Sequence, residues 1–566
     1  MIYFDTYKNF NKILNKLERR NFKINIFYAF FGMLLEMLGI ALILPAIKYW
    51  QTSTESSSGS ENSYDLLVTL GLIFALILIV KAIALSFFSH QRLKFIFGTL
   101  HSLQGSLLRH YINQPFAINL SRNSTSPIQK IIREAHEVVI NGIQVWILLT
   151  VEILAFIGLS SALLYIDPFS SSLILAVFLT FGLVAYSISR YKFESLGSVR
   201  PVLEETRLNL LRNIFDGIRT IKIYGRENYF YNIFTAVDFK INDLCSIVSF
   251  RFSLPRFWIE LLAFMAFSII ILVNYSVNQS FESILPILSV FTLAALRIIP
   301  SVNRILDGFQ QLKFANPAIA LMASNYKLDL SIPIESTKKL KFNRKIQFDG
   351  VSFCYSTRKK DVFTNLSFTV NRGECLGIIG PSGVGKSTFI DLIMGLLVPQ
   401  KGKITIDNSP IDNKLNIRKW QKQIGYVPQE IFILNNTLRH NIVFAIDDED
   451  INEKKLLDVI SVVQLDDLIQ SLPDGLETIL GDNGNQLSGG QRQRIGIARS
   501  LYHNPELLIF DEATSALDKK SEMSILKNIE QLKKTKTIIM IAHNKSSLFS
   551  CDKIIMLDSS GIIEVK

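Results

Sequence analysis

Six long apolar stretches dominate the first 300 residues of this 566-residue chain. A helix needs roughly 20 mainly apolar residues to cross about 30 Å of hydrocarbon. Six such stretches so close together are not expected in the core of a soluble protein. They occupy residues 26–49, 66–88, 143–165, 173–188, 257–273 and 284–299. The last three are short, so we expect them to continue into their polar flanks. The pattern predicts an α-helical polytopic membrane domain with six spans.

The loops between these stretches differ in charge. Segments 51–64, 168–172 and 274–283 contain no Lys or Arg, whereas the segments at the other ends of the spans contain many. Positive residues stay on the cytoplasmic side of a membrane. We therefore expect a multi-pass protein of the inner (cytoplasmic) membrane, with its N-terminus and C-terminal half in the cytoplasm. The net charge of +11 then reflects loops that face anionic lipid, and no nucleic-acid partner is expected.

Two cytoplasmic excursions, 89–142 and 189–256, are too long for simple connections. Both have helical patterns, and we expect them to continue the membrane helices and to contact the second domain. A weakly structured stretch follows the last span, and a β-pattern begins at KIQFDGVSFCY. We expect a transmembrane domain with cytoplasmic coupling helices over 1–315, a linker over 316–343 and an α/β domain over 344–566.

The segment GPSGVGKST at 380–388 fits the pattern G-x-x-x-x-G-K-[ST] of a P-loop NTPase. It lies between a strand-like apolar run and a helical one, which is the context that this motif requires. Glycines let backbone N–H groups close around phosphate oxygens at the positive end of a helix. Lys386 is expected to reach the β- and γ-phosphates, and Ser387 to bind Mg²⁺. The predicted ATP-binding residues of the loop are Gly380, Ser382, Gly383, Gly385, Lys386, Ser387 and Thr388.

A second motif, ELLIFDEATSALD, ends an apolar run in two carboxylates, Asp511 and Glu512. A buried parallel strand delivers both to the sheet edge that carries the phosphate loop. We expect Asp511 to hold Mg²⁺ through water and Glu512 to polarise the attacking water. A structural acidic pair at a strand end is the weaker alternative, because the phosphate loop requires a partner of this kind.

Between these motifs lies LSGGQ, followed by RQRIGIARSL. Generic phosphate-loop enzymes lack this pentapeptide, which is the signature of the ATP-binding cassette (ABC) family. The chain resembles that family over about 345–566. The resemblance implies two cassettes that dimerise head to tail, so that the signature of one closes over the ATP of the other. The signature residues are Leu487, Ser488, Gly489, Gly490 and Gln491.

Other family positions can be matched residue by residue. Tyr355 stands where an aromatic ring stacks on adenine. Gln429, in YVPQ, matches the glutamine that contacts Mg²⁺ or water and relays the nucleotide state to the membrane domain. Asp518 matches the dimer-contact loop, and His543 the histidine that senses the γ-phosphate. The resemblance thus implies Glu512, His543 and Gln429 as catalytic residues, and Ser387, Gln429 and Asp511 as Mg²⁺ ligands.

The chain departs from the family pattern at one visible point. The family usually continues His-Arg-Leu after the switch histidine, whereas this chain has His543-Asn544-Lys545. The change moves a basic residue by one position and removes no catalytic group. We therefore expect an active ATP hydrolase, with ATP and Mg²⁺ as its cofactors, coupled to transport.

Six spans followed by one cassette resemble the half-transporters among ABC exporters. One chain carries one phosphate loop and one signature, so two chains are needed to complete two ATP sites. A homodimer is the simplest arrangement, and a closely related heterodimer stays open.

Charged residues inside the predicted spans are costly and are therefore candidates for function. Structural ion pairs, or snorkelling near span ends, explain them equally well. The bases, doubled by dimer symmetry, would form a cavity attractive to an anionic head group, and Arg suits pyrophosphate. The charged residues are Glu36, Glu152, Glu260 and the candidate substrate-cavity bases Lys81, Arg256 and Arg297.

The membrane half also resembles bacterial flippases of lipid-linked oligosaccharides, best in LRIIPSVNRIL at 296–306. In that family basic cavity residues are implicated in contacts with the lipid's pyrophosphate. Arg256 and Arg297 match such positions, and Lys81 stands where Arg is expected. The resemblance implies ATP-driven flipping of a polyprenyl-pyrophosphate oligosaccharide, or another amphipathic substrate, from the inner to the outer leaflet.

Three alternatives compete with this hypothesis. Export of another lipid, a hydrophobic peptide or a drug would tolerate neutral residues in place of the three bases. An ATP-gated channel or regulator, from another class, would not depend on hydrolysis by Glu512. A soluble DNA-repair-type cassette ATPase is excluded by the six apolar stretches.

Overall fold

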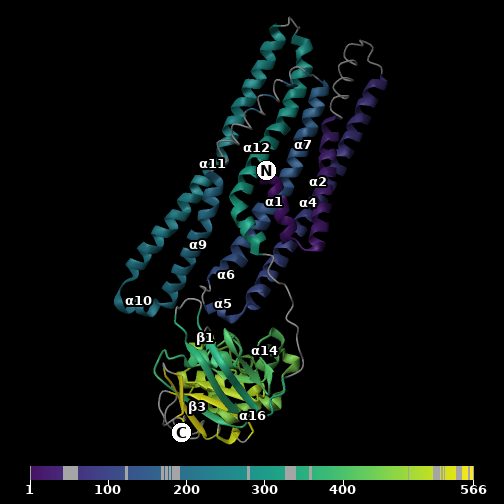
Figure 1. The fold of residues 1–566 in the computed structure, drawn as a ribbon. Helices are drawn as coiled ribbons and strands as arrows, with labels where there is room; N and C mark the ends of the chain where they lie inside the picture. The colour runs from purple at the N-terminus through teal and green to yellow at the C-terminus, as the bar shows by residue number, and fades with distance from the viewer. Residues whose placement is uncertain are drawn as a thin grey trace. The chain divides into compact units, whose positions relative to one another are not determined.

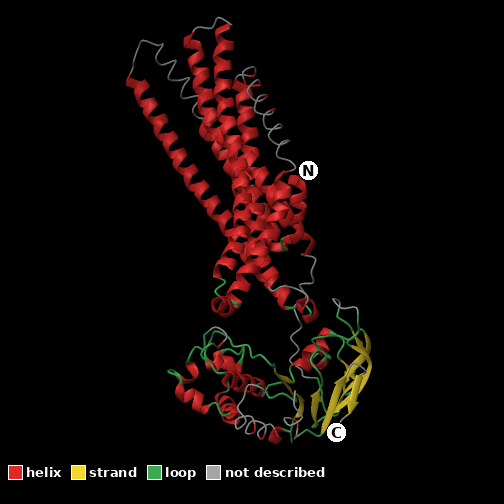
Figure 2. Cartoon of the chain, turned by 90° about the vertical axis from the view of Figure 1, so that its left-hand side faces the viewer, coloured by secondary structure: helices red, strands yellow, loops and turns green. Residues whose placement is uncertain are grey.

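The computed structural model describes residues 2–41, 61–120, 125–166, 192–276, 281–325, 340–355, 360–481, 484–513, 530–533, 535–542, 551–558 and 561–564, with single positions between some of these ranges. The chain divides into two compact units, Met1–Asn113 with Asn123–Leu330 and Gln114–Arg122 with Ser331–Lys566. The described part of the first unit is helical, and all the described strands belong to the second (Figures 1 and 2).

The helical unit contains several long helices and a few short helical segments. Its described elements are α1 (Ile2–Ile13), α2 (Lys16–Ala41), α4 (Glu61–Ile112), α6 (Thr125–Gln129), the π-helical stretches η1 (Lys130–Glu134) and η2 (Glu137–Gln144), α7 (Val145–Ile166), α9 (Lys192–Asp216), α10 (Ile218–Tyr224), α11 (Glu227–Ser276) and α12 (Phe281–Asn325).

Three of these helices are far longer than a membrane is thick. α4, α11 and α12 contain 52, 50 and 45 residues. At about 1.5 Å per residue, α4 alone is about 78 Å long, against about 30 Å for the hydrocarbon core of a bilayer. The helical extensions beyond the bilayer that the sequence predicts are therefore present.

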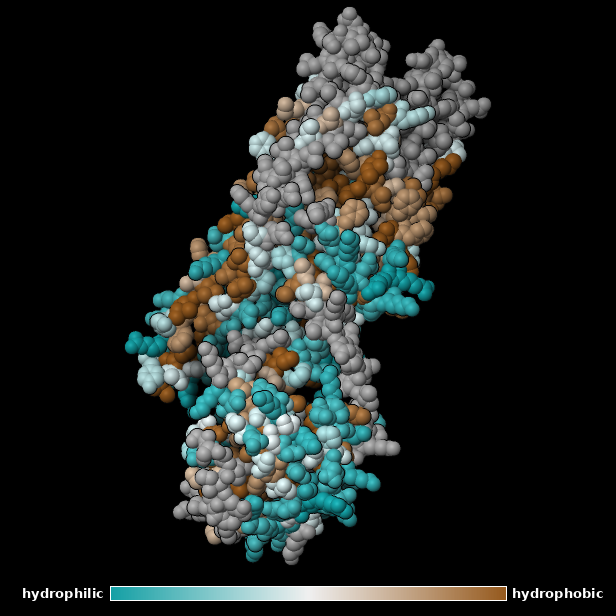
Figure 3. All heavy atoms as spheres, viewed as in Figure 1, coloured by the Kyte–Doolittle hydropathy of each residue, from teal (hydrophilic) through white to brown (hydrophobic). Residues whose placement is uncertain are grey.

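The surface of the helical unit is apolar where lipid is expected. Two segments in the described part of the chain, Gly71–Ile112 and Thr125–Tyr165, are long and apolar enough to cross a membrane. On α4 the side chains of Leu72 and Ile83 are 67% and 66% exposed, and Figure 3 shows apolar side chains gathered over this unit. Such exposure is typical of lipid-facing helices. The other predicted stretches lie partly or wholly outside the described side chains, so the count of six spans stays a prediction.

A short elbow joins α1 to α2. The backbone N–H of Glu18 donates to the Asn15 side-chain oxygen at 2.9 Å, and the backbone N–H of Asn15 donates to the Glu18 carboxylate at 2.8 Å. This reciprocal pair is a capping box, which fixes where a helix begins. The Tyr3 ring of α1 stacks on Trp146 of α7 with 4.6 Å between centroids. The elbow therefore holds the first turns of α2 in a defined position.

Buried ion pairs connect the π-helical stretches to α9. The Arg200 guanidinium lies 2.7 Å from a carboxylate oxygen of Glu137 and 3.5 Å from one of Glu134. On α9 itself, Arg207 lies 2.6 Å from Glu204. The three carboxylates are buried, so removal of Arg200 would leave Glu134 and Glu137 without their ion-pair partner. The two predicted cytoplasmic excursions are thus joined by ion pairs.

The second unit contains two sheets. The antiparallel sheet has the order β2-β1-β4-β5 and consists of β1 (Lys345–Phe353), β2 (Phe363–Asn371), β4 (Lys401–Ile406) and β5 (Ser409–Pro410). The six-stranded sheet has the order β10-β9-β3-β8-β7-β6. Its members are β3 (Cys375–Ile379), β6 (Ile424–Val427), β7 (Leu507–Asp511), β8 (Thr537–Ile541), β9 (Lys553–Asp558) and β10 (Gly561–Glu564). All its neighbours pair in parallel except the edge pair β10 and β9.

The second unit also contains short helices and one 14-residue helix, α18. They are α5 (Phe116–Leu120), α13 (Lys386–Ile393), α14 (Lys414–Gln421), α15 (Leu438–Val443), η3 (Asp448–Asp450), α16 (Glu453–Val463), α17 (Asp466–Ser471), η4 (Gly475–Glu477) and α18 (Gly489–Tyr502).

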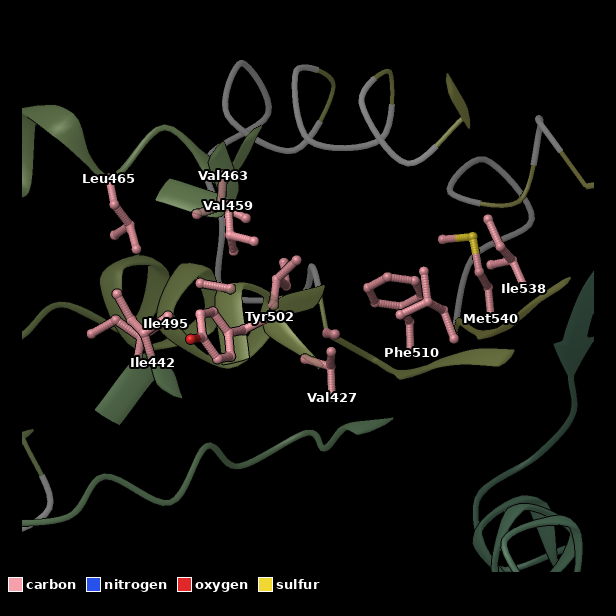
Figure 4. Packing of buried hydrophobic residues seen from close by; sticks show 14 of the residues in the cluster. Val427, Ile442, Val459, Val463, Leu465, Ile495, Tyr502, Phe510, Ile538 and Met540 are labelled. Carbon is pink, nitrogen blue, oxygen red and sulfur yellow. The ribbon is translucent and has the colours of Figure 1, made fainter. Parts of the chain in front are cut away.

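Two apolar cores lie on opposite faces of the parallel sheet. β3 and β8 are buried at every position, as expected for strands covered on both faces. Phe510 and Met540 face the core formed with α15, α16 and α18 (Figure 4). Ile509, one residue from Phe510, belongs to the other core, with Phe389 of α13. The period-2 alternation of the strands therefore fills both cores.

Arg499 braces α18 against the chain that follows β6. Its Nε donates to the Asn441 carbonyl and its Nη1 to the Phe432 carbonyl, each at 2.8 Å. The guanidinium also lies 4.7 Å from the centre of the Phe444 ring. Burial lowers the pKa of Arg499 to about 10. This value is still well above 7, so the guanidinium stays charged at neutral pH.

We expect Arg499→Ala to lower the free energy of unfolding of this unit by about 2–4 kcal/mol, because two carbonyls lose a charged donor. Thermal unfolding of the full-length protein in detergent measures the loss. Arg418→Ala is the matched control, since Arg418 is exposed on α14, and it should change stability by at most about 0.5 kcal/mol. Equal effects of the two variants would contradict the bracing role.

Candidate functional site

The carboxyl ends of four parallel strands meet at one edge of the six-stranded sheet. β3 leads into the predicted phosphate loop, and β6 ends two residues before Gln429. β7 ends at Asp511, followed by Glu512. β3, β8, β7 and β6 are consecutive neighbours in the sheet, so these segments share one edge, where ligands bind in open α/β sheets. The structure thus brings together residues that the sequence separates by more than 130 positions.

The predicted phosphate loop has the backbone that its glycines predict. Gly383 has φ 81° and Gly385 has φ 109°, a region that side chains other than that of glycine rarely adopt. A Cβ on Gly385 would also overlap Val362. Lys386 begins α13 and donates from Nζ to the Gly380 carbonyl at 2.7 Å. The loop therefore holds Lys386 at the positive end of a helix, beside its backbone N–H groups.

Tyr355 lies against the same loop. Its hydroxyl and that of Thr388 are 2.9 Å apart, and its ring packs edge-on to Phe353 with 5.0 Å between centroids. The side chain is half-buried, so part of the ring stays open to a partner. The structure places Tyr355 beside the phosphate loop, and its stacking on a bound base stays a prediction.

Gln429 and Glu512 are in direct contact. Gln429 Nε2 donates to Glu512 Oε2 at 2.7 Å. Glu512 has φ 52°, a conformation that costs about 1–3 kcal/mol for a residue with a side chain and is concentrated at functional sites. Burial raises the pKa of Asp511, and the neighbouring charge of Glu512 raises it further. The edge therefore holds closely spaced carboxylates that a cation would stabilise.

Two further residues at this edge were not predicted from the sequence. The Tyr426 hydroxyl of β6 lies 3.4 Å from Asp511 Oδ2, and its pKa is raised by burial and by the Asp511 charge. Burial raises the pKa of Asp391, on α13, to about 6, and the charge of Asp511 adds to the shift. Asp391 stands five positions after Lys386, and this spacing was the only signal available in the sequence.

The folded pKa of Asp391, about 6, lies above the ordinary 3.8. The folded protein then holds a proton that the unfolded chain has lost, so stability falls as the pH rises from about 4 to about 6. We expect Asp391→Asn to remove this fall and to raise the free energy of unfolding at pH 7.5 by about 1–2 kcal/mol. The full difference in pKa corresponds to about 3 kcal/mol, and water screens a half-buried charge.

Thermal unfolding of the nucleotide-free, full-length protein at pH 4.5 and 7.5 tests this expectation. Asp458→Asn is the control, because Asp458 is exposed on α16, and it should leave both values within about 0.5 kcal/mol. An Asp391→Asn variant with the pH dependence of the wild type would show that another group titrates in this range.

The signature segment begins a helix. Ser488 caps α18: its hydroxyl accepts from the backbone N–H of Gln491 at 3.2 Å, and its own backbone N–H donates to Gln491 Oε1 at 2.8 Å. Gly489 and Gly490 form the first turn, and Leu487 is buried beneath it. LSGGQ therefore presents small residues and helix N–H groups at its surface, the donor set that an anion requires.

Two predicted residues of the cassette, Asp518 and His543, lie outside the described residues. In the helical unit, Lys81 lies on α4, half-buried, and forms no ion pair within the described part of the chain. Arg256 is exposed on α11 and lies 3.2 Å from Glu260, one turn further along. Arg297 belongs to α12, with its side chain outside the described set.

The acidic residues of the predicted spans also include one with a described ion pair and one whose side chain is not described. Glu152 of α7 is buried and lies 2.7 Å from Arg304 of α12. The ion-pair explanation considered for Glu152 and Glu260 therefore has a structural basis. Glu36 belongs to α2, and its side chain is not among those described.

A sequence model of the ABC transporter family matches residues 363–515, from β2 to just beyond Glu512. An ATP-dependent lipid A-core flippase of Cupriavidus metallidurans is 27% identical over 474 residues, which cover 82% of this chain and 78% of the flippase. A protein of the same description from Methylobacillus flagellatus is 31% identical over 375 residues, 66% of this chain and 61% of that protein. ABC transporter B family member 14 of Arabidopsis thaliana is 38% identical over 267 residues, 47% of this chain and 21% of the plant protein.

The fold has a counterpart among solved structures. A bacterial Atm1-family ABC exporter with ATP bound superposes with a TM-score of 0.80 at 21% identity, over 97% of this chain and 96% of the exporter. The match covers both the helical unit and the cassette. The comparisons therefore show an ATP-binding and ATP-hydrolysing ABC transporter domain over residues 363–515, in a chain with the fold of an ABC exporter half-transporter.

Proposed function

We propose that this protein flips a lipid-linked substrate with an anionic head group from the inner to the outer leaflet, driven by ATP hydrolysis. The main support is the similarity to ATP-dependent lipid A-core flippases, which extends over 82% of the chain and so includes membrane and cassette regions. Within this class, a polyprenyl-pyrophosphate oligosaccharide is the substrate that we propose. A phosphorylated glycolipid of the lipid A type is the second candidate, favoured by the names of the relatives.

ATP binds at the edge of the parallel sheet. Lys386 and the backbone of the loop hold the β- and γ-phosphates, and Tyr355 stacks on the adenine. Ser387, Asp511 and Gln429 would hold Mg²⁺, because their hydroxyl, carboxylate and amide oxygens are the hard donors that this ion prefers. The raised pKa of Asp511 fits this assignment, because a cation relieves the repulsion from Glu512. When bound, Mg²⁺ neutralises charge on the phosphates.

Glu512 is the base for the attacking water in this proposal. Gln429 holds its carboxylate through the 2.7 Å hydrogen bond, which orients the base before substrate arrives. His543 is proposed to sense the γ-phosphate and Asp518 to form the dimer contact. Gln429 is also proposed to relay the state of the nucleotide to the membrane domain.

Two copies of the chain form the working transporter in this proposal. One chain has one phosphate loop and one signature, and Ser488 with the N-terminus of α18 offers donors to the ATP held by the partner. The dimer lies in the inner membrane with its cassettes in the cytoplasm, surrounded by membrane lipid. ATP binding closes the cassette pair and turns the cavity outward, and hydrolysis resets it.

The proposed cavity bases differ in their surroundings. The charge of Arg256 is partly balanced by Glu260 at 3.2 Å. Lys81 forms no ion pair within the described residues. Lys81 is therefore a stronger candidate for the head group than Arg256, which is proposed as an outer contact. A Lys gives charge without the bidentate geometry of Arg, so Lys81 suits steering of the phosphates more than their recognition.

The test is ATP-dependent translocation in proteoliposomes, with polyprenyl-pyrophosphate oligosaccharide and lipid A-core as parallel substrates. We expect wild-type protein to move the first, Glu512→Gln to move neither, and Lys81→Gln to lower the rate roughly tenfold while ATP hydrolysis persists. Lys81→Arg should restore transport. Transport of lipid A-core alone would favour the second candidate, and hydrolysis without either transport would refute the substrate class.

A further inference from the structure

The beginning of α2 carries four bases on one face. They stand at relative positions 0, 3, 4 and 7, which one side of a helix shares. A cavity of about 490 Å³ lies at this face. Its lining consists of Lys16, Arg19, Arg20, Lys23, Ile24 and Phe27.

Nothing in the described part of the chain neutralises these bases. None of the four forms an ion pair there, and the lining of the cavity contains no acidic side chain. Glu18, the acidic residue of the first turn, is buried and its carboxylate accepts from the backbone N–H of Asn15. Arg19 is held in place by the Leu14 carbonyl, to which its Nε donates at 2.9 Å. Like charges one turn apart repel, and the positive end of a helix disfavours them further.

The same face becomes apolar as α2 continues. Ile24 and Phe27 complete the cavity, and Phe31 and Leu34 follow at helical spacing. Phe27, Phe31 and Leu34 are 62%, 46% and 38% exposed, and the rings of Phe27 and Phe31 lie 6.5 Å apart at an angle of 24°. The first predicted span begins at residue 26, so the change from charge to apolar surface falls at the expected cytoplasmic boundary of the membrane.

We propose that this face of α2 binds a resident anionic phospholipid of the cytoplasmic leaflet. The four bases hold its phosphate, and the stripe from Phe27 to Leu34 receives an acyl chain. Charge complementarity and the continuity of the apolar stripe argue for a bilayer lipid over a soluble phosphate, which would leave the stripe uncovered. The elbow fixed by Asn15 and Glu18 presents the bases, so lipid binding would anchor the N-terminal end of the helical unit. The site is independent of the transported substrate.

The test uses the full-length protein in neutral detergent, with bound lipid counted by native mass spectrometry. Phosphatidylglycerol and phosphatidylcholine of identical chains are compared. We expect the wild type to prefer phosphatidylglycerol roughly tenfold, and Lys16→Gln, Arg19→Gln, Arg20→Gln and Lys23→Gln together to reduce the preference to about twofold or less. The matched control removes the same charge from the cassette, at Lys414, Arg418, Lys419 and Lys422, and should keep the preference of the wild type.

Two further measurements keep the proposal testable if the fourfold variant does not fold. Phe27→Ala with Phe31→Ala keeps the bases and should weaken retention of long-chain phosphatidylglycerol severalfold. Glycerol phosphate, the soluble head group alone, should not displace the bound lipid. Equal losses in the α2 and cassette variants would show diffuse attraction, displacement by glycerol phosphate would show a phosphate site without a lipid, and either result would overturn the proposal.

Discussion

Glu512→Gln should reduce ATP hydrolysis by roughly 10²- to 10⁴-fold while ATP binding is retained. The substitution keeps the size of the side chain, and its amide oxygen can accept the hydrogen bond that Gln429 Nε2 now donates at 2.7 Å. An amide takes no proton at neutral pH, so the attacking water loses its base. Phosphate release by the reconstituted full-length protein measures turnover, and retention of labelled ATP measures binding.

The same strand supplies a matched control. Glu506 precedes β7, at the end opposite Glu512, and lies 3.0 Å from Arg372 in a partly exposed ion pair. Glu506→Gln makes the identical chemical change outside the site and should leave turnover within about twofold. Hydrolysis at the wild-type rate in Glu512→Gln would mean that another group activates the water. Transport without hydrolysis in that variant would favour the ATP-gated channel or regulator instead.

Gly197→Ala is expected to lower the stability of the helical unit by about 2–3 kcal/mol. Gly197 is buried on α9, and a methyl group at this position would overlap the backbone carbonyl of Phe314 on α12. A backbone oxygen cannot rotate away as the end of a side chain can, so the two helices must move apart by about an ångström. That movement also disturbs Arg200, whose guanidinium lies 5.5 Å from the centre of the Phe314 ring. The melting temperature and the yield of folded protein in detergent report the loss.

The controls for this variant lie on α4. Gly98 and Gly105 are helical, and a methyl group at either would meet nothing within 4 Å. Alanine has the better helix propensity, so both substitutions should be neutral or stabilising by up to about 1 kcal/mol. If the Gly197→Ala protein had the same melting temperature as these controls, α9 and α12 could move apart without loss of stability, and the prediction would be wrong.

The cassette was largely predictable because its motifs are short runs of consecutive residues. The phosphate loop, Asp511 with Glu512, and LSGGQ each occupy a few consecutive residues, and the expected meeting of strand ends follows from parallel pairing. Contacts that depend on the packing of distant elements were not predictable. Asp391 and Tyr426 reach the edge from α13 and β6. Tyr426 begins the YVPQ segment and Asp391 follows Lys386 by five positions, but neither pattern indicates that these side chains approach Asp511.

In the helical unit, too, local patterns were predictable and contacts between distant helices were not. Apolar length predicts long helices, and Arg256 with Glu260 is visible as a pair at i and i+4. The pairing of Glu152 with Arg304 joins α7 to α12 across 152 positions and needs the tertiary structure. The requirement for glycine at 197 likewise follows from the path of a second backbone, which no property of the neighbouring sequence determines.

The length and continuity of α4 have a mechanical consequence. Its 52 residues contain no proline, so the helix acts as a rigid lever about 78 Å long. A tilt of about 5° would move one end relative to the other by about 7 Å, without breaking a backbone hydrogen bond. Displacement at one end of α4 can thus become a displacement of similar size at the other end, and whole-helix rotation would achieve this without refolding the helix.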